Sequence, residues 1–208
     1  TGLKSELLDH RLRANLAVFY NDYQNLQVAF YAPAYIGSRR GNAGQAHSYG
    51  VELETEARIT DALSAQFSAG YLFAVYDEYR GAGGAGVNAD GNRLTNSPRW
   101  SLSGGATWDV PVQIPGALRV GVNAQYQTKT YSNAIPSPGG QHEIPAQGFL
   151  NAVATWTSPD PHWSVVLSAR NLLDSGKLVS STYTPSTGVY YQNFPDPRTV
   201  LVTLRYAL

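Results

Sequence analysis

The sequence lacks cysteine and methionine and has no long apolar run. Without cysteine among its 208 residues, the chain can form neither a disulfide framework nor a thiolate metal site. Without methionine, and with a first segment that has no basic stretch and no apolar core, it does not begin like a precursor, so we expect a fragment or a processed protein. Since no run of about 18 apolar residues occurs, a transmembrane helix is excluded.

Charge is also scarce. Charged residues make up 14% of the chain, whereas about 25% is usual. Basic and acidic residues balance at 15 each, which gives no support for nucleic-acid binding or for a polybasic membrane patch. Tyrosine and glycine are abundant, at 14 and 20 residues. This mixture favours a sheet with one apolar and one polar face over a soluble helical core.

Apolar residues recur at every second position. In the last segment, Val200, Val202 and Leu204 alternate with polar or charged neighbours, and the same period marks segments within 12–20, 49–58, 63–73, 100–109, 118–126 and 163–170. Successive side chains of a strand point to opposite faces, so each segment predicts a strand with one apolar face. We expect an all-β, antiparallel up-and-down meander of about eight to nine transmembrane strands. The side chains predicted to face outward are Leu16, Leu53, Val120, Val122, Val165, Leu167, Val202 and Leu204. Those predicted to face inward are Glu52, Glu54, Glu56, Arg119, Asn123 and Arg205.

The connections between these segments alternate in length. Long ones are predicted at 173–197, 132–147 and 80–98, a moderate one at 36–42, and short ones at 8–10, 60–62, 111–116 and 158–161. Bacterial outer-membrane barrels combine short periplasmic turns with long extracellular loops, whereas a soluble sandwich has no reason to keep this asymmetry. Segments 12–31 and 63–80 are predicted to be strands longer than the 9–11 residues that cross a bilayer.

Aromatic residues follow the same division. Trp108, Trp156, Trp163 and Tyr206 fall beside the short turns or near the C-terminus. A second group falls toward the long loops: Tyr20, Tyr71, Phe73, Trp100, Tyr126 and Tyr131. Two belts at two interfaces are typical of a lipid-embedded barrel, although aromatic residues are common in any strand.

Several segments resemble the TonB-dependent receptor family, in that family's order. They are LRANLAVFYNDYQNLQV (12–28), NAG (42–44) with SYGVELE (48–54), NSPRW (96–100), ARNLLD (169–174) and PRT (197–199). The resemblance covers essentially the whole chain. The last strand also resembles the signal read by the barrel assembly machinery, with Leu208 in place of the usual phenylalanine.

The resemblance implies a 22-stranded barrel around an N-terminal plug domain. Residues 1–208 would then be the C-terminal segment of the barrel, without plug or TonB box, and open or artificially curled in isolation. It implies a bacterial cell outer-membrane location and TonB-dependent uptake of a scarce nutrient. A ferric-siderophore complex is the first choice, with cobalamin or an oligosaccharide left open. The implied partners are outer-membrane lipid, the TonB–ExbB–ExbD system, the barrel assembly machinery and the ligand. A small self-contained barrel, acting as a passive pore or as a structural or adhesion protein, is the alternative.

Ligand contacts are expected in the long loops, where aromatic and cationic side chains can grip a bulky, anionic metal chelate. The candidates are Tyr35, Arg39, Arg40, Arg80, Arg93, Tyr183, Tyr190 and Tyr191. Loop solvation and interface anchoring are the alternative roles for each. The row Glu52, Glu54, Glu56 and Arg58 favours a lumenal salt-bridge lattice, with Arg11 or Arg13, over substrate binding.

No motif predicts catalysis. The glycine-rich run at 81–86 matches a dinucleotide pattern, but turn-forming residues follow it where a helix would be needed. Asn88, Asp90 and Asn92 could hold a hard cation, yet no following glutamate completes a known loop. The four histidines are scattered and have no metal-ligand spacing. We therefore expect no catalytic, metal or cofactor site, and no enzyme.

Overall fold

The computed structural model describes residues 1–31, 38–42, 44–82, 86–136, 139–160, 162–184 and 188–207. These residues form strands, turns and loops, and none of them belongs to a helix. The described part of the chain therefore offers no helical segment that could span a membrane. This agrees with the all-β class expected from the two-residue period.

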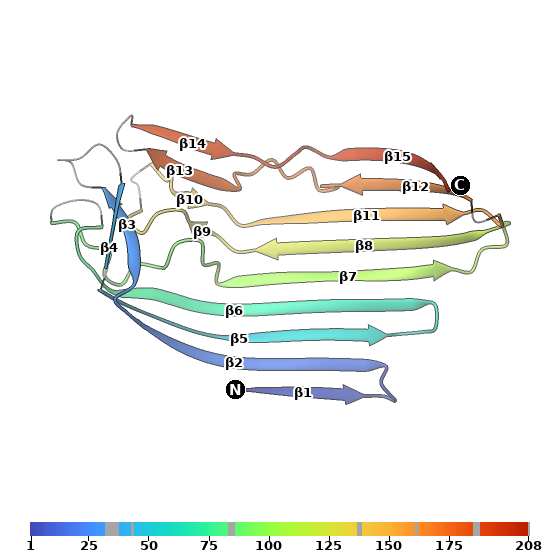
Figure 1. Cartoon of the computed structure of the whole chain (residues 1–208), viewed down its shortest axis with the longest axis horizontal. Coiled ribbons are helices and arrows are strands. Elements are labelled where there is room, and N and C mark those ends of the chain that lie inside the picture. Colours follow the sequence, from blue (N-terminus) through green and yellow to red (C-terminus); the bar gives the residue numbers. More distant parts are fainter. Residues whose placement is uncertain are drawn as a thin grey trace.

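Nine strands form one antiparallel sheet in which neighbours in the chain are neighbours in space (Figure 1). They are β1 (Gly2–Leu7), β2 (Leu12–Gln24), β5 (Gly44–Arg58), β6 (Leu63–Tyr79), β7 (Trp100–Val110), β8 (Ala117–Gln127), β11 (Gln147–Thr157), β12 (Trp163–Arg170) and β15 (Thr199–Tyr206). Within the described residues β1 and β15 do not pair, so the meander is confirmed and the sheet is unclosed.

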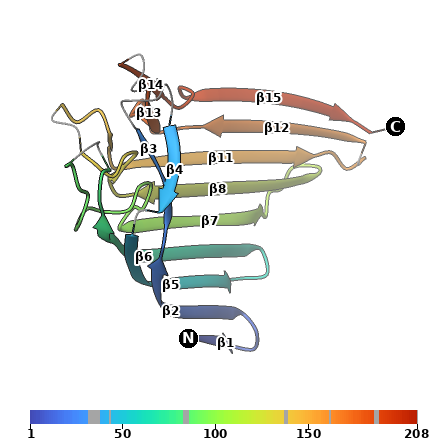
Figure 2. The same cartoon turned by 60° about the vertical axis from the view of Figure 1, so that its left-hand side comes forward.

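Three further pairs of strands lie inside the long connections. They are β3 (Gln27–Tyr31) with β4 (Ser38–Asn42), β9 (Thr130–Tyr131) with β10 (Glu143–Ile144), and β13 (Ser180–Thr184) with β14 (Val189–Asn193). In both views β3 and β4 run across the direction of the nine strands rather than along it (Figure 2).

The β3–β4 pair corrects one expectation. The strand predicted over 12–31 leaves the main sheet after Gln24, because Asn25 adopts the left-handed backbone conformation, with φ 57°, and turns the chain. Residues Gln27–Tyr31 then pair with Ser38–Asn42 instead of continuing along β5. The moderate connection predicted at 36–42 is therefore part of a longer connection, 25–43. The other long strand, predicted over 63–80, is confirmed as β6.

The sheet has one apolar and one polar face, as predicted. Leu16 is paired with Leu53, and Val165 with Leu204, so these apolar side chains share rows across neighbouring strands. The apolar face is bare: Val202 is 65% exposed and Leu204 64%. A soluble protein rarely exposes so large a continuous apolar surface, whereas a sheet surrounded by lipid requires one.

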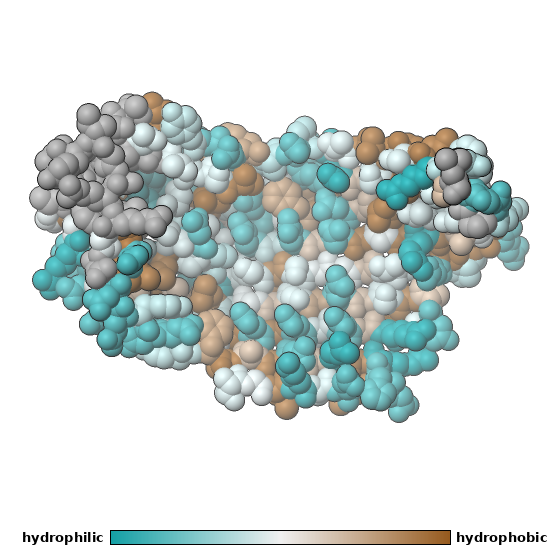
Figure 3. All heavy atoms as spheres, in the orientation of Figure 1, coloured by the Kyte–Doolittle hydropathy of each residue, from teal (hydrophilic) through white to brown (hydrophobic). Residues whose placement is uncertain are grey.

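The polar face carries the side chains predicted to point inward. Figure 3 shows polar side chains spread among small ones over the middle of the sheet face turned to the viewer. On this face Glu56 shares a row with Asn123, through Gln66 and Gly105. Gly50 is needed here, because a Cβ at that position would lie 2.6 Å from the Phe19 ring and 2.3 Å from the Tyr71 carbonyl oxygen.

Candidate ligand-binding rim

The four long connections emerge at one end of the sheet, and the four short turns at the other (Figure 1). We call the end formed by connections 25–43, 80–99, 128–146 and 171–198 the rim. The C-terminus lies at the short-turn end. At the rim, side chains from several long connections can meet around one ligand, as in other binding sites that rigid scaffolds present on loops.

A small apolar cluster supports the rim. Its buried members come from β5, β6 and two of the connections: Ala46, Tyr76, Tyr79, Ala89 and Ala134, with Leu26, Val28, Ala82, Leu94 and Ile135 packed against them. The Tyr76 and Tyr79 rings meet edge to face, with their centroids 4.9 Å apart. The part of β6 that lies between its last pairing with β7, at Tyr71–Trp100, and the rim is thus covered by residues of the connections.

Connection 80–99 is held against β6 by its own polar groups. Asp90 Oδ1 accepts a 2.6 Å hydrogen bond from the Tyr79 amide, and Asn88 Oδ1 accepts one of 3.3 Å from the Gly81 amide. The Asn92 side chain donates to the Ala134 carbonyl at 2.9 Å, which links this connection to 128–146. The three side chains considered for a cation therefore bond to backbone groups. Nowhere in the described ranges do three or more histidine, aspartate or glutamate side chains gather as a metal site would require.

Among the cationic candidates, Arg80 and Arg93 are described in full. Arg80 is exposed and pairs with Glu78 at 2.9 Å. Arg93 is half-buried and donates to the Ser97 carbonyl at 2.6 Å and to the Lys129 carbonyl at 3.3 Å. Burial, and then the neighbouring Arg99, lower the pKa of Arg93 from its usual range. Arg93 therefore joins two connections, whereas Arg80 forms an exposed ion pair with Glu78 of β6.

The remaining candidates are distributed over two hairpins of the rim. Arg39 and Arg40 belong to β4 and Tyr183 to β13, but their side chains lie outside the described part, as does the whole of Tyr35. Tyr191 is 60% exposed on β14. Tyr190, beside it, is half-buried and contacts the His142 ring, with centroids 5.5 Å apart. The structure thus places all the described candidates at the rim. Their role in ligand binding stays a prediction.

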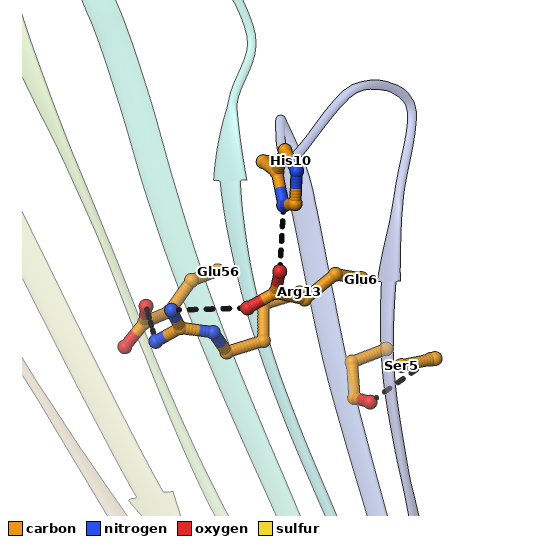
Figure 4. Close-up of polar contacts among 6 residues, drawn as sticks. Ser5, Glu6, His10, Arg13 and Glu56 are labelled. Atoms are coloured by element: carbon orange, nitrogen blue, oxygen red, sulfur yellow. Dashed lines mark hydrogen bonds and ion pairs between the residues drawn. The ribbon is translucent and has the colours of Figure 1, made fainter.

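At the opposite end, the polar face carries a lattice of ion pairs. Arg13 of β2 lies between Glu6 and Glu56, at 3.4 Å from each, and His10 approaches Glu6 at 2.6 Å (Figure 4). Further pairs join Arg11 to Asp61 at 3.5 Å and Arg119 to Asp109 at 2.6 Å. All these side chains line one hollow of about 1010 Å³. Of the lattice predicted from sequence, Glu56 pairs with Arg13, whereas Arg11 and Arg58 pair with Asp61. Within the described residues Glu52 and Glu54 form no ion pair, so the prediction is confirmed only in part. Because these pairs are exposed to solvent, each adds little to stability.

Two aromatic belts border the apolar face. At the short-turn end the Trp163 and Tyr206 rings are 4.7 Å apart, and the Trp156 indole N–H donates to the Pro115 carbonyl at 3.0 Å. Toward the rim, Tyr71 packs against Trp100 at 5.0 Å. One residue of the belt near the rim, His47, was not predicted from the sequence. Its ring stacks among those of Tyr20, Tyr49 and Phe73, and it pairs with Asp77 at 2.7 Å. Only the strand register reveals that contact.

Solved structures with the same fold include receptors for uptake. The ferric yersiniabactin uptake receptor FyuA from Yersinia pestis matches with a TM-score of 0.78 at 18% identity, over 99% of this chain and 29% of that one. The siderophore receptor PiuA from Acinetobacter baumannii matches with 0.76 at 21%, over 99% and 27%. The ferric-catecholate import receptor Fiu from E. coli K12 matches with 0.71 at 19%, over 99% and 26%. This chain thus spans less than a third of the length of each.

The sequence itself matches a family over most of its length. The family described as "TonB dependent receptor-like, beta-barrel" matches residues 1–172. The match covers β1 to β12, together with the rim connections between them, and its antiparallel barrel agrees with the nine-stranded meander. The chain belongs to the β-barrel of the TonB-dependent receptors, which are outer-membrane transporters and not enzymes.

Proposed function

We propose that the chain forms the C-terminal part of a receptor barrel that takes up a ferric-siderophore complex across the outer membrane. The observation that carries this proposal is the rim: four long connections, braced by an apolar cluster, bring exposed cationic and aromatic side chains to one end of a lipid-facing sheet. Siderophore receptors are prominent among the proteins with the same fold, which supports the choice of ligand class.

The other parts of the receptor and its partners are proposed from the family. The outer edges of β1 and β15 pair with no other described strand, and they require partners, because lipid does not tolerate open backbone groups. In the proposed arrangement further barrel strands supply those partners, and a plug domain occupies the space in front of the polar face. The TonB–ExbB–ExbD system would act on that plug, and the barrel assembly machinery would insert the barrel.

An uptake measurement tests the proposal. Cells that carry the intact receptor are grown under iron limitation and given radiolabelled iron as ferric citrate, a catecholate complex or a hydroxamate complex. We expect accumulation of at least one complex, which disappears both when the receptor gene is deleted and when TonB is deleted. Accumulation that survives the loss of TonB would indicate a passive pore. Uptake of none of the complexes would remove the siderophore assignment and leave the barrel family intact.

A further inference from the structure

An arginine lies close to the rim on the apolar side of the sheet, the side that faces lipid. Phe73 of β6 pairs with Tyr49 of β5, and Leu53, further along β5, points to the apolar face. Since side chains four residues apart on a strand point to the same face, the Phe73 ring faces the apolar side as well. The Arg99 guanidinium carbon lies 5.1 Å from the centre of that ring, so this cation stands on the lipid-facing side.

Arg93 approaches the same side from connection 80–99. It forms an isolated antiparallel bridge with Val75, which follows Phe73 by two residues on β6. Residues that are paired across antiparallel strands share a face, so the Arg93 side chain also starts on the lipid-facing side. Burial lowers the pKa of Arg93, and the positive charge of the nearby Arg99 lowers it further. The two guanidinium groups therefore repel each other.

Lys129 completes the group from connection 128–146. Its carbonyl oxygen accepts a 3.3 Å hydrogen bond from Arg93, and its ammonium lies 5.7 Å from the centre of the Tyr131 ring. Tyr131 also interacts electrostatically with Arg93. We call Arg93, Arg99 and Lys129 the outer cation cluster. Lys129 pairs with Glu143 at 3.1 Å, so three cations and one carboxylate leave two positive charges.

The outer cation cluster has no carboxylate partner for its two arginines within the part of the chain that the structure describes. Arg93 donates to carbonyl oxygens, and Arg99 contacts an aromatic ring. Arg99 and Lys129 are exposed, so a ligand can reach them. Two guanidinium groups that repel each other favour a shared anionic partner, and phosphate suits them because arginine forms short, bidentate hydrogen bonds with its oxygens.

The depth of the cluster matches the headgroup layer of a membrane. Tyr71 and Trp100 belong to the aromatic belt, and such belts lie where the hydrocarbon layer meets the headgroups. Phe73 and Val75, which mark the levels of the two arginines, follow Tyr71 by two and four residues on β6. On a strand tilted by about 45° this places the arginines roughly 5 and 10 Å beyond the belt. The headgroup layer on each side of a bilayer is roughly 5–8 Å thick.

We infer that the outer cation cluster binds the phosphate group of a lipid headgroup in the membrane leaflet on the rim side. Arg99 and Lys129 contact the phosphate oxygens, the half-buried Arg93 adds positive charge behind them, and the acyl chains lie against Tyr71 and Trp100. The bare apolar side next to the cluster favours a lipid over a soluble anion, which has no apolar part to cover it. The inference rests on the outer-membrane family of the chain and not on the ligand proposed for the rim.

Native mass spectrometry of the purified intact receptor tests the inference. Dioleoyl phosphatidic acid, with a phosphate monoester headgroup, is compared with dioleoyl phosphatidylethanolamine, which has the same acyl chains and no net charge. A cation near an anionic membrane surface contributes about fivefold in affinity, so we expect the wild type to prefer phosphatidic acid by about tenfold. The double change Arg99→Gln and Lys129→Gln, which removes two exposed cations, should reduce this preference to less than about twofold.

Two double variants serve as controls. Arg11→Gln with Arg58→Gln also removes two cations, but from the polar side at the short-turn end, and should leave the preference unchanged. Arg99→Lys with Lys129→Arg keeps both charges and should retain most of the preference, which a purely structural role of these side chains would not predict.

Three outcomes would overturn the inference. They are a wild type without preference for phosphatidic acid, a preference that survives the glutamine changes, and displacement of the lipid by an equal concentration of inorganic phosphate, which would indicate a site for free phosphate. None of these measurements involves TonB or iron uptake, so the proposed function stands or fails separately.

Discussion

Val202 stands near the middle of β15, as the fourth of its eight residues, and faces out from the apolar side. At such a depth an arginine side chain must enter the hydrocarbon layer. Val202→Arg in the intact barrel should therefore reduce the free energy of unfolding in lipid by about 2–4 kcal/mol. Denaturant titration in liposomes measures the change. Thr203→Arg is the matched control, because the neighbouring position faces the polar side. Equal costs at both positions would contradict the assignment of faces.

Arg80 and Arg93 look alike in the sequence, but Arg93 has a structural role, whereas Arg80 is exposed to solvent. The Arg93 guanidinium donates to two backbone carbonyls from two connections, so Arg93→Ala leaves both carbonyls without a charged donor. Hydrogen bonds to charged groups contribute about 1.5–3 kcal/mol each, and we expect a local loss within that range. Hydrogen exchange of the amides in 86–99 measures it. Arg80→Ala, which removes only an exposed ion pair, should change the same amides by less than about 1 kcal/mol.

At the scale of the strands, much of the structure could be predicted from the sequence. Alternation was enough to locate seven of the nine sheet strands and their faces, because one side of each is lipid-exposed and apolar, whereas β1 and β11 showed no such pattern and followed only from the lengths of the connections. The hairpins β3–β4 and β13–β14 could not be located in this way, since they stand outside the bilayer and have no constant environment on either face. The turn at Asn25, which ends β2, depends on a single backbone conformation that the residue pattern did not reveal.

The candidate site was predictable only in part, for the same reason. Because long and short connections alternate along the chain, all the candidates were expected at one end of the sheet. The structure shows the described candidates at that end. The pairing of Arg93 with the carbonyls, and the meeting of serines and glutamines on the polar face, depend on strand register and loop contacts. Register joins residues from five strands, and a single-strand pattern contains no information about it.

Connection 80–99 is predicted to behave as one folded element because Asp90 fastens it to the end of β6. Asp90→Ala leaves the Tyr79 amide without its 2.6 Å acceptor, at a cost of about 1–3 kcal/mol. The connection should then be cut faster by a protease, while β6 to β8 stay protected. Asp90→Asn keeps an acceptor oxygen and should remain close to the wild type. Equal cleavage rates in the alanine variant and the wild type would show that the apolar cluster alone holds the connection.

At the scale of the whole molecule, the two open edges and the two unlike faces of the sheet indicate that it belongs in a closed barrel within a membrane. An open sheet of this width would aggregate in water through β1 and β15, and its bare apolar face would add to that tendency. Both problems vanish when further strands pair with the edges and lipid covers the apolar side. The lattice of ion pairs at the short-turn end of the polar face then faces an enclosed lumen, where its charged groups remain hydrated or bind a partner.

The rim is predicted to capture an anionic ferric chelate by its positive charge. Arg39, Arg40 and Arg80 all belong to rim segments, and removing three cations from one mouth lowers the local potential that raises association rates. The triple change to glutamine should slow association of ferric citrate with the intact receptor by about tenfold or more at low salt. The difference should shrink toward zero near 1 M salt, where the screening length falls to about 3 Å. Stopped-flow binding at several salt concentrations measures both effects. Arg58→Gln, which removes a cation at the short-turn end, is the control and should leave the rate unchanged. If the triple variant associates as fast as the wild type at low salt, electrostatic capture at the rim is wrong, and the chelate must be held by the tyrosines and by other parts of the barrel.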